Sequence, residues 1–277
     1  ATTFVLPALS VIALCVFVPM LLALALAFTR CSQFLTISWA GLDNFQRLLH
    51  DTRALKALGN TCFYTVAFVP LNLAFALAIA LLLNRQFPGI RVIRAAFFVP
   101  VAVSGVVAIS IFNFIFDRNY GPLNAVLQTL GLAPVAWLRD KDLAMWSIIL
   151  MSLWKSVAFF SIILLAALQD VPAELHEAAT VDGAGAWSRF WNVTLPSIRS
   201  VVLTVVLIST IGCFRVFEPM FVLTKGGPSD STRTVALLAY DAAFGEGQLG
   251  YATAISLCLL FIIVAVTLVL NRVTKEK

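Results

Sequence analysis

Six long apolar stretches constrain what this chain can fold into. They cover residues 4–29, 60–83, 95–116, 143–168, 201–223 and 250–270. A bilayer core of about 30 Å requires roughly 20 apolar residues in a helix, whereas barrel strands are shorter and alternate. Backbone groups in lipid must be bonded within the segment, which a helix achieves. The sequence therefore predicts an all-α, polytopic membrane protein with six transmembrane helices in a single domain over residues 1–277.

The composition argues against a soluble protein. Of the 277 residues, 61% are hydrophobic and 12% are charged, against roughly 45–50% and 25% in soluble domains. A very hydrophobic soluble enzyme would expose large apolar patches. The net charge is +5, but the 19 basic residues are scattered over loops and helix ends rather than gathered into a stripe. We therefore expect membrane lipid around the chain and no nucleic-acid partner.

The sequence offers no set of residues for catalysis or metal binding. The five cysteines have no CxxC spacing and four lie in apolar runs, which is typical of packing residues. His176 and Glu177 begin like the zincin motif HExxH, but residue 180 is Thr. No nucleophile–base pair is evident in the apolar stretches. We predict that the chain is not an enzyme and holds no catalytic, cofactor-binding or metal-binding residues.

The N-terminal stretch is too long for the apolar region of a signal peptide and lacks an obvious cleavage site, so it is predicted to be a retained helix. Residue 1 is Ala, and we expect the numbering to begin inside a longer native chain. Pro7, Pro19, Pro70 and Pro100 fall inside apolar stretches, where proline marks kinks or helix ends.

Six spans place both termini on one side of the membrane, together with loops 84–94 and 169–200. By the positive-inside rule, the face richer in Lys and Arg is cytoplasmic. We count eight basic residues on this face and nine on the opposite face, but the eight occupy a shorter length of chain. The charge pattern therefore favours cytoplasmic termini.

Loop 169–200 contains the pattern of a short helix. Asp170 is predicted to be its N-cap, with Pro172 and then Glu174 in the first turn. Asp182 and Gly183 end it, because Gly readily takes the left-handed conformation of a helix C-cap.

A second short helix is predicted after this break. Trp187, Phe190 and Trp191 share one of its faces, and Leu195-Pro196 is expected to end it. Two small helices joined by a Gly hinge would form a knob outside the bilayer. An alternative is a segment that only rests on lipid headgroups, as its tryptophans would allow.

The sequence EAATVDGAGAWSRFWNVTLP of this loop resembles the EAA loop of permease subunits in bacterial ATP-binding-cassette (ABC) importers. That family's pattern is EAA, two residues, DGA, five residues, F, two residues, usually I, one residue and LP. Val193 stands where the pattern has Ile. The matching residues are Glu177, Ala178, Ala179, Asp182, Gly183, Ala184, Phe190, Leu195 and Pro196.

The resemblance extends over nearly the whole chain. GLDNF at 41–45, FDRNYGPLN at 116–124, KGGPSDSTRT at 225–234 and LGYATA at 249–254 are similar to segments of sugar-importer permeases. They fit best the maltose or glycerol-3-phosphate type, and within it the first of the two permease subunits.

The resemblance implies a type I ABC importer fold in the bacterial cytoplasmic membrane. It implies a second homologous permease subunit, two ATP-binding subunits and an extracytoplasmic solute-binding protein as partners. The EAA loop would be a cytoplasmic coupling helix held by the ATPase, which also implies cytoplasmic termini. The chain has no GxxxxGK[ST] phosphate loop, so ATP and Mg would be bound by the separate ATPase subunits and no cofactor by this chain.

Polar residues inside the apolar stretches are the candidates for a substrate path, because such residues usually face a cavity or a partner. An intrahelical pair of Arg215 and Glu218, at i, i+3 spacing, is an equally good explanation for both residues. Interhelical hydrogen bonding explains Asn72 and Asn113 better than solute contact. The candidates are Arg215, Glu218, Lys155, Asn72 and Asn113.

The predicted function is that of a permease subunit that couples ATPase closure to alternating access. The alternative is a subunit of an ion-gradient-driven secondary transporter, but such proteins often show internal repeats and we find no convincing repeat here. The solute is left open among maltose and other oligosaccharides, trehalose-like sugars, and glycerol phosphates and their esters.

Overall fold

The computed structural model describes residues 2–31 and 37–275, and most of them are helical. Four helices are long and apolar enough to cross a membrane, and two bent helix pairs qualify if each pair counts as one span. Counted this way, the described residues contain the six spans that the sequence predicts.

The first predicted span is a helix with one wider turn. It consists of α1 (Thr2–Ile12), the π-helical η1 (Ala13–Phe17) and α2 (Val18–Leu26). Pro19, which has no N–H to donate, lies in the first turn of α2, directly after the π-helical turn that accommodates it. The helix ends at Leu26 rather than residue 29, because the chain turns into a hairpin of β1 (Thr29–Cys31) and β2 (Ile37–Trp39).

The second span is longer than predicted. After α3 (Asp43–His50), α4 (Thr52–Leu83) begins at Thr52 rather than at residue 60. Asp51 caps it by accepting hydrogen bonds from the backbone N–H groups of Arg53 and Ala54. Pro70 lies within α4 without interrupting it. Predicting the span from apolar residues alone missed the polar first turns of this helix.

The third stretch is not one helix, so the prediction of a single helix over residues 95–116 is wrong. It is divided into α5 (Ile90–Ala102) and α6 (Gly105–Ile115), whose axes differ by 97°. Val103 and Ser104 are extended between them, after Pro100 in the last turn of α5. Hydropathy cannot reveal the break, because the residues around it are themselves apolar or small.

The fourth span is confirmed as α8 (Ala144–Gln169), which follows α7 (Pro122–Thr129). Loop 169–200 then forms α9 (Ala173–Val181), α10 (Ala186–Arg189), η2 (Phe190–Thr194) and α11 (Leu195–Ser197). Residues 169–200 are called the knob below.

The fifth span is shorter than predicted. Its helix α12 (Arg199–Phe214) meets the preceding helical segment at 70° and ends at Phe214. Residues 215–219 precede the π-helical η3 (Met220–Thr224), so residues 201–223 are not one helix. The chain continues through α13 (Val235–Tyr240) and η4 (Asp241–Gly245) into α14 (Leu249–Lys275), the sixth span.

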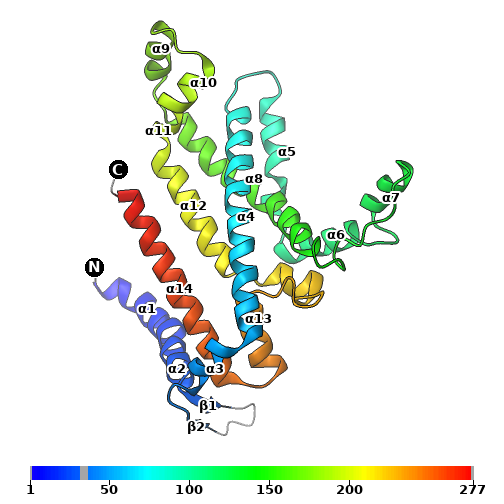
Figure 1. Cartoon of the computed structure of the whole chain (residues 1–277). Coiled ribbons are helices and arrows are strands. Elements are labelled where there is room, and N and C mark those ends of the chain that lie inside the picture. Colours follow the sequence, from blue (N-terminus) through cyan, green and yellow to red (C-terminus); the bar gives the residue numbers. More distant parts are fainter. Residues whose placement is uncertain (1, 32–36, 276–277) are drawn as a thin grey trace.

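The helices are arranged so that the knob stands at one end of the molecule (Figure 1). The connection between α4 and α5 lies at the same end, and α14 runs toward it to the C-terminus. The hairpin β1–β2, α3 and α13 lie at the opposite end, called the far end below.

The packing of α4 against α8 forms the centre of the core. Ala76 and Ala80 of α4 are completely buried, and the hydroxyl of Ser161 on α8 donates a hydrogen bond to the Ala76 carbonyl at 3.2 Å. Small residues allow two helix backbones to approach closely, which is the main source of helix association within lipid.

At the far end, α14 passes so close to β1 that Gly250 has no space for a side chain. A Cβ at this position would lie 2.0 Å from the backbone oxygen of Thr29. Asn44 reinforces the contact by donating hydrogen bonds to the carbonyls of Ala27 and Thr29 at 2.8 and 2.9 Å. This packing holds the first and last spans together.

We predict that Gly250→Ala lowers the stability of the purified protein by roughly 1–3 kcal/mol, the usual cost of overpacking. The matched control is Gly59→Ala in α4, where a Cβ would meet nothing within 4 Å. The control should be neutral or slightly stabilising, since Ala favours helix over Gly. Thermal unfolding in detergent measures both. Equal melting temperatures would show that the contact does not hold the spans together.

Candidate functional site

The helix α9 forms the exposed part of the knob. It has no buried residue among its nine, and Glu174 lies in its first turn as predicted. The predicted N-cap is wrong, because Asp170 is the C-cap of α8 and Pro172 occupies the position before α9. The chain leaves α8 in a tight turn, so the first acid completes that helix instead of starting the next one.

The Gly hinge is confirmed. Gly183 has a φ of +79°, in the left-handed region that favours glycine. Its N–H donates to the Thr180 carbonyl at 3.0 Å, and the N–H of Ala184 donates to the Ala179 carbonyl at 2.9 Å. These bonds satisfy carbonyl groups at the end of α9 and fix the direction of the chain into α10.

The aromatic face of the second short helix is also confirmed. The rings of Trp187, Phe190 and Trp191 contact one another with centroids 5.3–6.1 Å apart. The prediction that Leu195-Pro196 ends this helix is confirmed to within one residue, because α11 ends at Ser197, before the 70° bend into α12. The π-helical turn η2 precedes Pro196, so the helix continues to Ser197 despite the missing proline N–H.

The structure brings the predicted coupling residues into the knob. Glu177, Ala178 and Ala179 lie on α9, and Asp182, Gly183 and Ala184 form the turn after it. Phe190 begins η2, while Leu195 and Pro196 lie in α11. The residues of the motif are therefore divided between an exposed helix and the support that joins it to α12.

A cavity of about 320 Å³ lies between α4, α8 and α12. Both helix breaks reach it, since Gly105 at the start of α6 and Val216, Glu218 and Pro219 after α12 line its wall. Backbone that is not helical at membrane depth is tolerated where it lines a cavity or is buried in protein. The cavity therefore lies where the two breaks in the spans meet.

Two oppositely charged side chains of this cavity lie close to Gly105. A Cβ on Gly105 would lie 3.1 Å from Oε2 of Glu218 and 3.4 Å from Nζ of Lys155. The predicted pair of Arg215 and Glu218 is absent from the ion pairs between the described residues, because the helix ends at Phe214 before either residue. Glu218 and Lys155 both line the cavity next to Gly105, although they too are absent from the ion pairs between the described residues, and Arg215 is not among the residues that line the cavity.

Asn72 lies outside the cavity and holds one of its lining residues. It is fully buried in α4 and its Nδ2 donates to the hydroxyl of Ser209, a cavity residue on α12, at 3.2 Å. This is the interhelical hydrogen bond expected of Asn72. Asn113 does not share this place, because it lines a separate cavity of about 680 Å³ with Asp117, Arg139 and others.

The sequence did not single out Gly105, Ser209 or Tyr64, although all three line the cavity with Lys155 and Glu218. Small and aromatic residues are common in spans, so their types carry no signal. The Ser104-Gly105 pair shortly after Pro100 is the one local hint of a break. Within the described residues, no three His, Cys, Asp or Glu side chains group closely enough to hold a metal.

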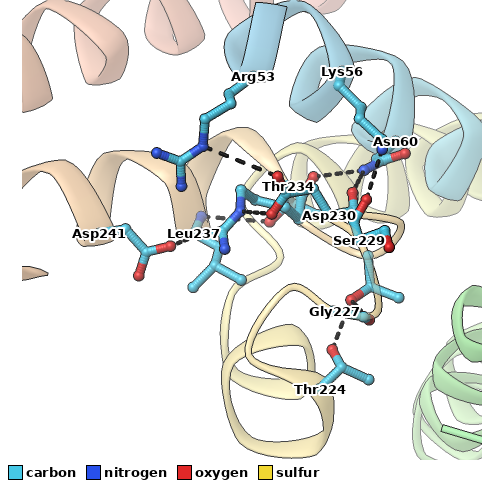
Figure 2. A network of polar contacts seen from close by, with 12 residues as sticks. Arg53, Lys56, Asn60, Thr224, Gly227, Ser229, Asp230, Thr234, Leu237 and Asp241 are labelled. Carbon is cyan, nitrogen blue, oxygen red and sulfur yellow. Dashed lines mark hydrogen bonds and ion pairs between the residues drawn. The ribbon is translucent and has the colours of Figure 1, made fainter. Parts of the chain in front are cut away.

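A polar network at the far end ties loop 225–234 to the start of α4 (Figure 2). Arg233 forms ion pairs with Asp230 and Asp241, and Arg53 pairs with Asp230 at 4.0 Å. The amide of Asn60 donates to the backbone carbonyls of Asp230 and Arg233 at 2.7 and 2.9 Å.

The network also shifts the ionisation of its central acid. A hydrogen bond and ion pair from Arg233, only partly offset by burial, lower the pKa of Asp230 below its ordinary value of 3.8. The carboxylate is therefore charged, and stabilises the loop, at neutral pH.

Comparison with known proteins decides the family. The model of the binding-protein-dependent transport system inner membrane component family matches residues 72–276. The chain belongs to this family. It is a multi-pass permease of an ABC importer that depends on a solute-binding protein, and it is a transport subunit rather than an enzyme. The alternative of an ion-gradient-driven secondary transporter is therefore wrong.

Similar permeases have been described in several microorganisms. The probable ABC transporter permease protein YesP of Bacillus subtilis is 35% identical over 92% of this chain and 84% of its own length. The trehalose/maltose transport system permease protein MalF of Thermococcus litoralis is 32% identical, over 97% and 91%. The multiple sugar-binding transport system permease protein MsmF of Streptococcus mutans is 36% identical, over 86% and 82%.

A solved structure shares the fold of the permease. It is a bacterial alginate ABC transporter in complex with a periplasmic protein that carries an alginate pentasaccharide. One of its chains superposes with a TM-score of 0.88 at 22% identity, over 99% of this permease and 93% of that chain. The fold of this chain is therefore one already found in a solved ABC transporter.

We predict that Asp230→Asn destabilises the permease at neutral pH and that the difference disappears in acid. A lowered carboxyl pKa contributes stability above its ordinary value of 3.8, which is lost as the pH falls through the lowered pKa. Melting temperatures of both proteins from neutral to acidic pH measure this. Asp142→Asn, at an exposed residue outside the ion pairs of the described residues, should show no such convergence. A gap independent of pH would contradict the assignment.

Proposed function

We propose that this permease moves a sugar or glycerophosphate-type solute into the cell with one homologous permease and two ATP-binding subunits. ATP and Mg are bound and ATP is hydrolysed in those separate subunits. The observation that carries this proposal is the knob, an exposed helix rigidly joined to the bent base of a span. A solute-binding protein delivers the solute at the opposite end.

The structure of the knob suits it to transmit movement from a partner subunit to the fifth span. The exposed α9 offers Glu177 and the small Ala178 and Ala179 to a partner. Two features hold α9 against α10. One is the turn at Gly183, and the other is a hydrogen bond that Nη1 of Arg189 donates to the Thr180 hydroxyl at 2.7 Å. The helical segment of α10 continues through η2 and α11 to α12, so movement of α9 is transmitted to the fifth span.

The orientation follows from the same proposal. An ATPase acts from the cytoplasm, so the knob end is cytoplasmic and the far end faces outward. With six crossings both termini lie at the knob end, as the positive charge density also favours. The polar network around Asp230 then belongs to the outer face.

The solute would pass through the cavity that holds Lys155 and Glu218. Hydroxyl groups of a sugar can accept from an ammonium group and donate to a carboxylate, and both groups reach the cavity next to Gly105. The named substrates of the relatives are trehalose, maltose and multiple sugars, which supports a carbohydrate. Arg215 and Asn113 lie outside this cavity, and Asn72 would act only by positioning Ser209.

We predict that Gly183→Val uncouples transport. Any side chain at a φ of +79° strains the backbone by about 1–2 kcal/mol, although a Cβ there would meet nothing within 4 Å. The turn that fixes α9 would open, and solute-dependent ATPase activity and uptake by the reconstituted complex should both fall.

The matched control is Gly185→Val, two residues further on. Gly185 has equal space but a φ of −69°, which Val tolerates. Co-purification of the tagged permease with the second permease and the ATPase shows that each variant still assembles. Full coupling in Gly183→Val, or a permease that transports without an ATPase, would refute the proposed function.

We predict that Glu218→Gln lowers uptake about tenfold to a hundredfold while the complex still assembles, since a hydrogen bond to a charged group contributes about 1.5–3 kcal/mol. Arg215→Ala is the matched control, because Arg215 lies in the same break but outside the cavity. Uptake of labelled solute into proteoliposomes measures both. If Glu218→Gln transports normally, Glu218 does not contact the solute.

A further inference from the structure

The two halves of the knob differ in charge. Residues 170–183, which include α9, carry four acids and no Lys or Arg. Residues 184–200, which include α10, η2 and α11, carry Arg189 and Arg199 and no acid. The acidic half therefore favours a positively charged neighbour, and the basic half favours a negatively charged one.

The basic half also exposes a cluster of large aromatic rings. Trp187 and Trp191 are 74% and 49% exposed, although both contact Phe190 and each other. Exposed rings gathered on one face of a helix mark a surface that another apolar phase covers. Polar side chains lie beside this face, where the amide of Asn192 donates to the Ser188 hydroxyl at 3.0 Å.

Helix geometry places the rings on the side of α10 opposite the contact that Arg189 makes with α9. In a helix of 3.6 residues per turn, Arg189 lies about opposite the shared face of Trp187 and Trp191. Arg189 reaches α9, where its guanidinium donates to Thr180. Thus α9 covers one side of α10, and the aromatic cluster faces the other side.

The position of α10 relative to the spans indicates that this aromatic side faces the membrane surface. The helical segment 186–197 meets α12 at 70°, so it runs steeply across the axis of the fifth span just where that span ends. A helix so inclined at the end of a span lies close to the plane of the membrane surface. Tryptophan is enriched at this depth, where its ring contacts acyl chains and its N–H remains in the polar region.

We propose that the face formed by Trp187, Phe190 and Trp191 rests in the headgroup region of the membrane, next to anionic phospholipids that Arg199 attracts. The lipid surface then supports one side of the knob while the ATPase moves α9 on the other side. That this is the inner leaflet rests on the proposed function, whereas the contact with lipid does not. An ATPase subunit on the same face is the competing outcome.

Photo-crosslinking in the assembled importer tests this placement. The phenylalanine analogue p-benzoylphenylalanine replaces Trp187 in one variant and Val181, an 88% exposed residue of α9, in another. After illumination in native membranes, mass spectrometry should find phospholipid adducts at residue 187 and adducts with a protein subunit at residue 181. A protein adduct at residue 187, or no lipid adduct there, would overturn the proposal. A missing protein adduct at residue 181 alone would count against the proposed coupling function instead.

A pair of double variants tests the consequence for transport. Trp187→Phe/Trp191→Phe keeps the rings, and Trp187→Ser/Trp191→Ser removes them. In nanodiscs with phosphatidylglycerol, the Phe pair should retain most ATPase coupling and the Ser pair should lose most of it. The unmodified protein should couple better in these nanodiscs than in nanodiscs of phosphatidylcholine alone, and this difference should shrink in the Ser pair. Equal lipid dependence in both pairs would contradict a role for the rings at the lipid surface.

Discussion

A backbone that crosses a bilayer must satisfy its own hydrogen-bonding groups, and the arrangement of this permease depends on that constraint. The helices α4, α8 and α14 satisfy it by running unbroken through the membrane. The third and fifth spans break, and both breaks lie in one cavity. Irregular backbone and the charged ends of Lys155 and Glu218 are thus placed where they do not face lipid.

The unbroken helices make these breaks tolerable. Close packing of α4 on α8 through Ala76, Ala80 and Ser161 provides a rigid wall for the cavity. At the far end, Gly250 lets α14 approach β1, and the network around Arg233 fastens loop 225–234 to α4. Under the proposed function, movement that begins at the knob enters α12, whose two ends are both bends rather than fixed helix.

The sequence predicted the helices well where hydropathy alone decides their ends. It predicted them poorly where a break lies inside an apolar stretch or where a cap residue stands between two helices. Hydropathy located both ends of α8 and the start of α14 to within one residue, but it ended the sixth span five residues early, and it extended the fifth span past Phe214 because apolar residues resume at Met220 beyond the break. It joined α5 to α6 for the same reason. In the knob, the Gly183 hinge and the ring cluster followed from local chemistry, whereas Asp170 was assigned to the wrong helix since a cap residue between two helices fits either one.

The sequence by itself determined that the chain is a six-span permease with an exposed knob, because apolar length, the EAA pattern and the glycine at residue 183 are local properties of the chain. Only the tertiary structure decided which charged residues share a cavity. Glu218 shares a cavity with Lys155 and not with Arg215 because two broken helices converge on α8 from distant parts of the sequence. Such a meeting depends on how the spans pack against one another, which spacing along the chain does not encode.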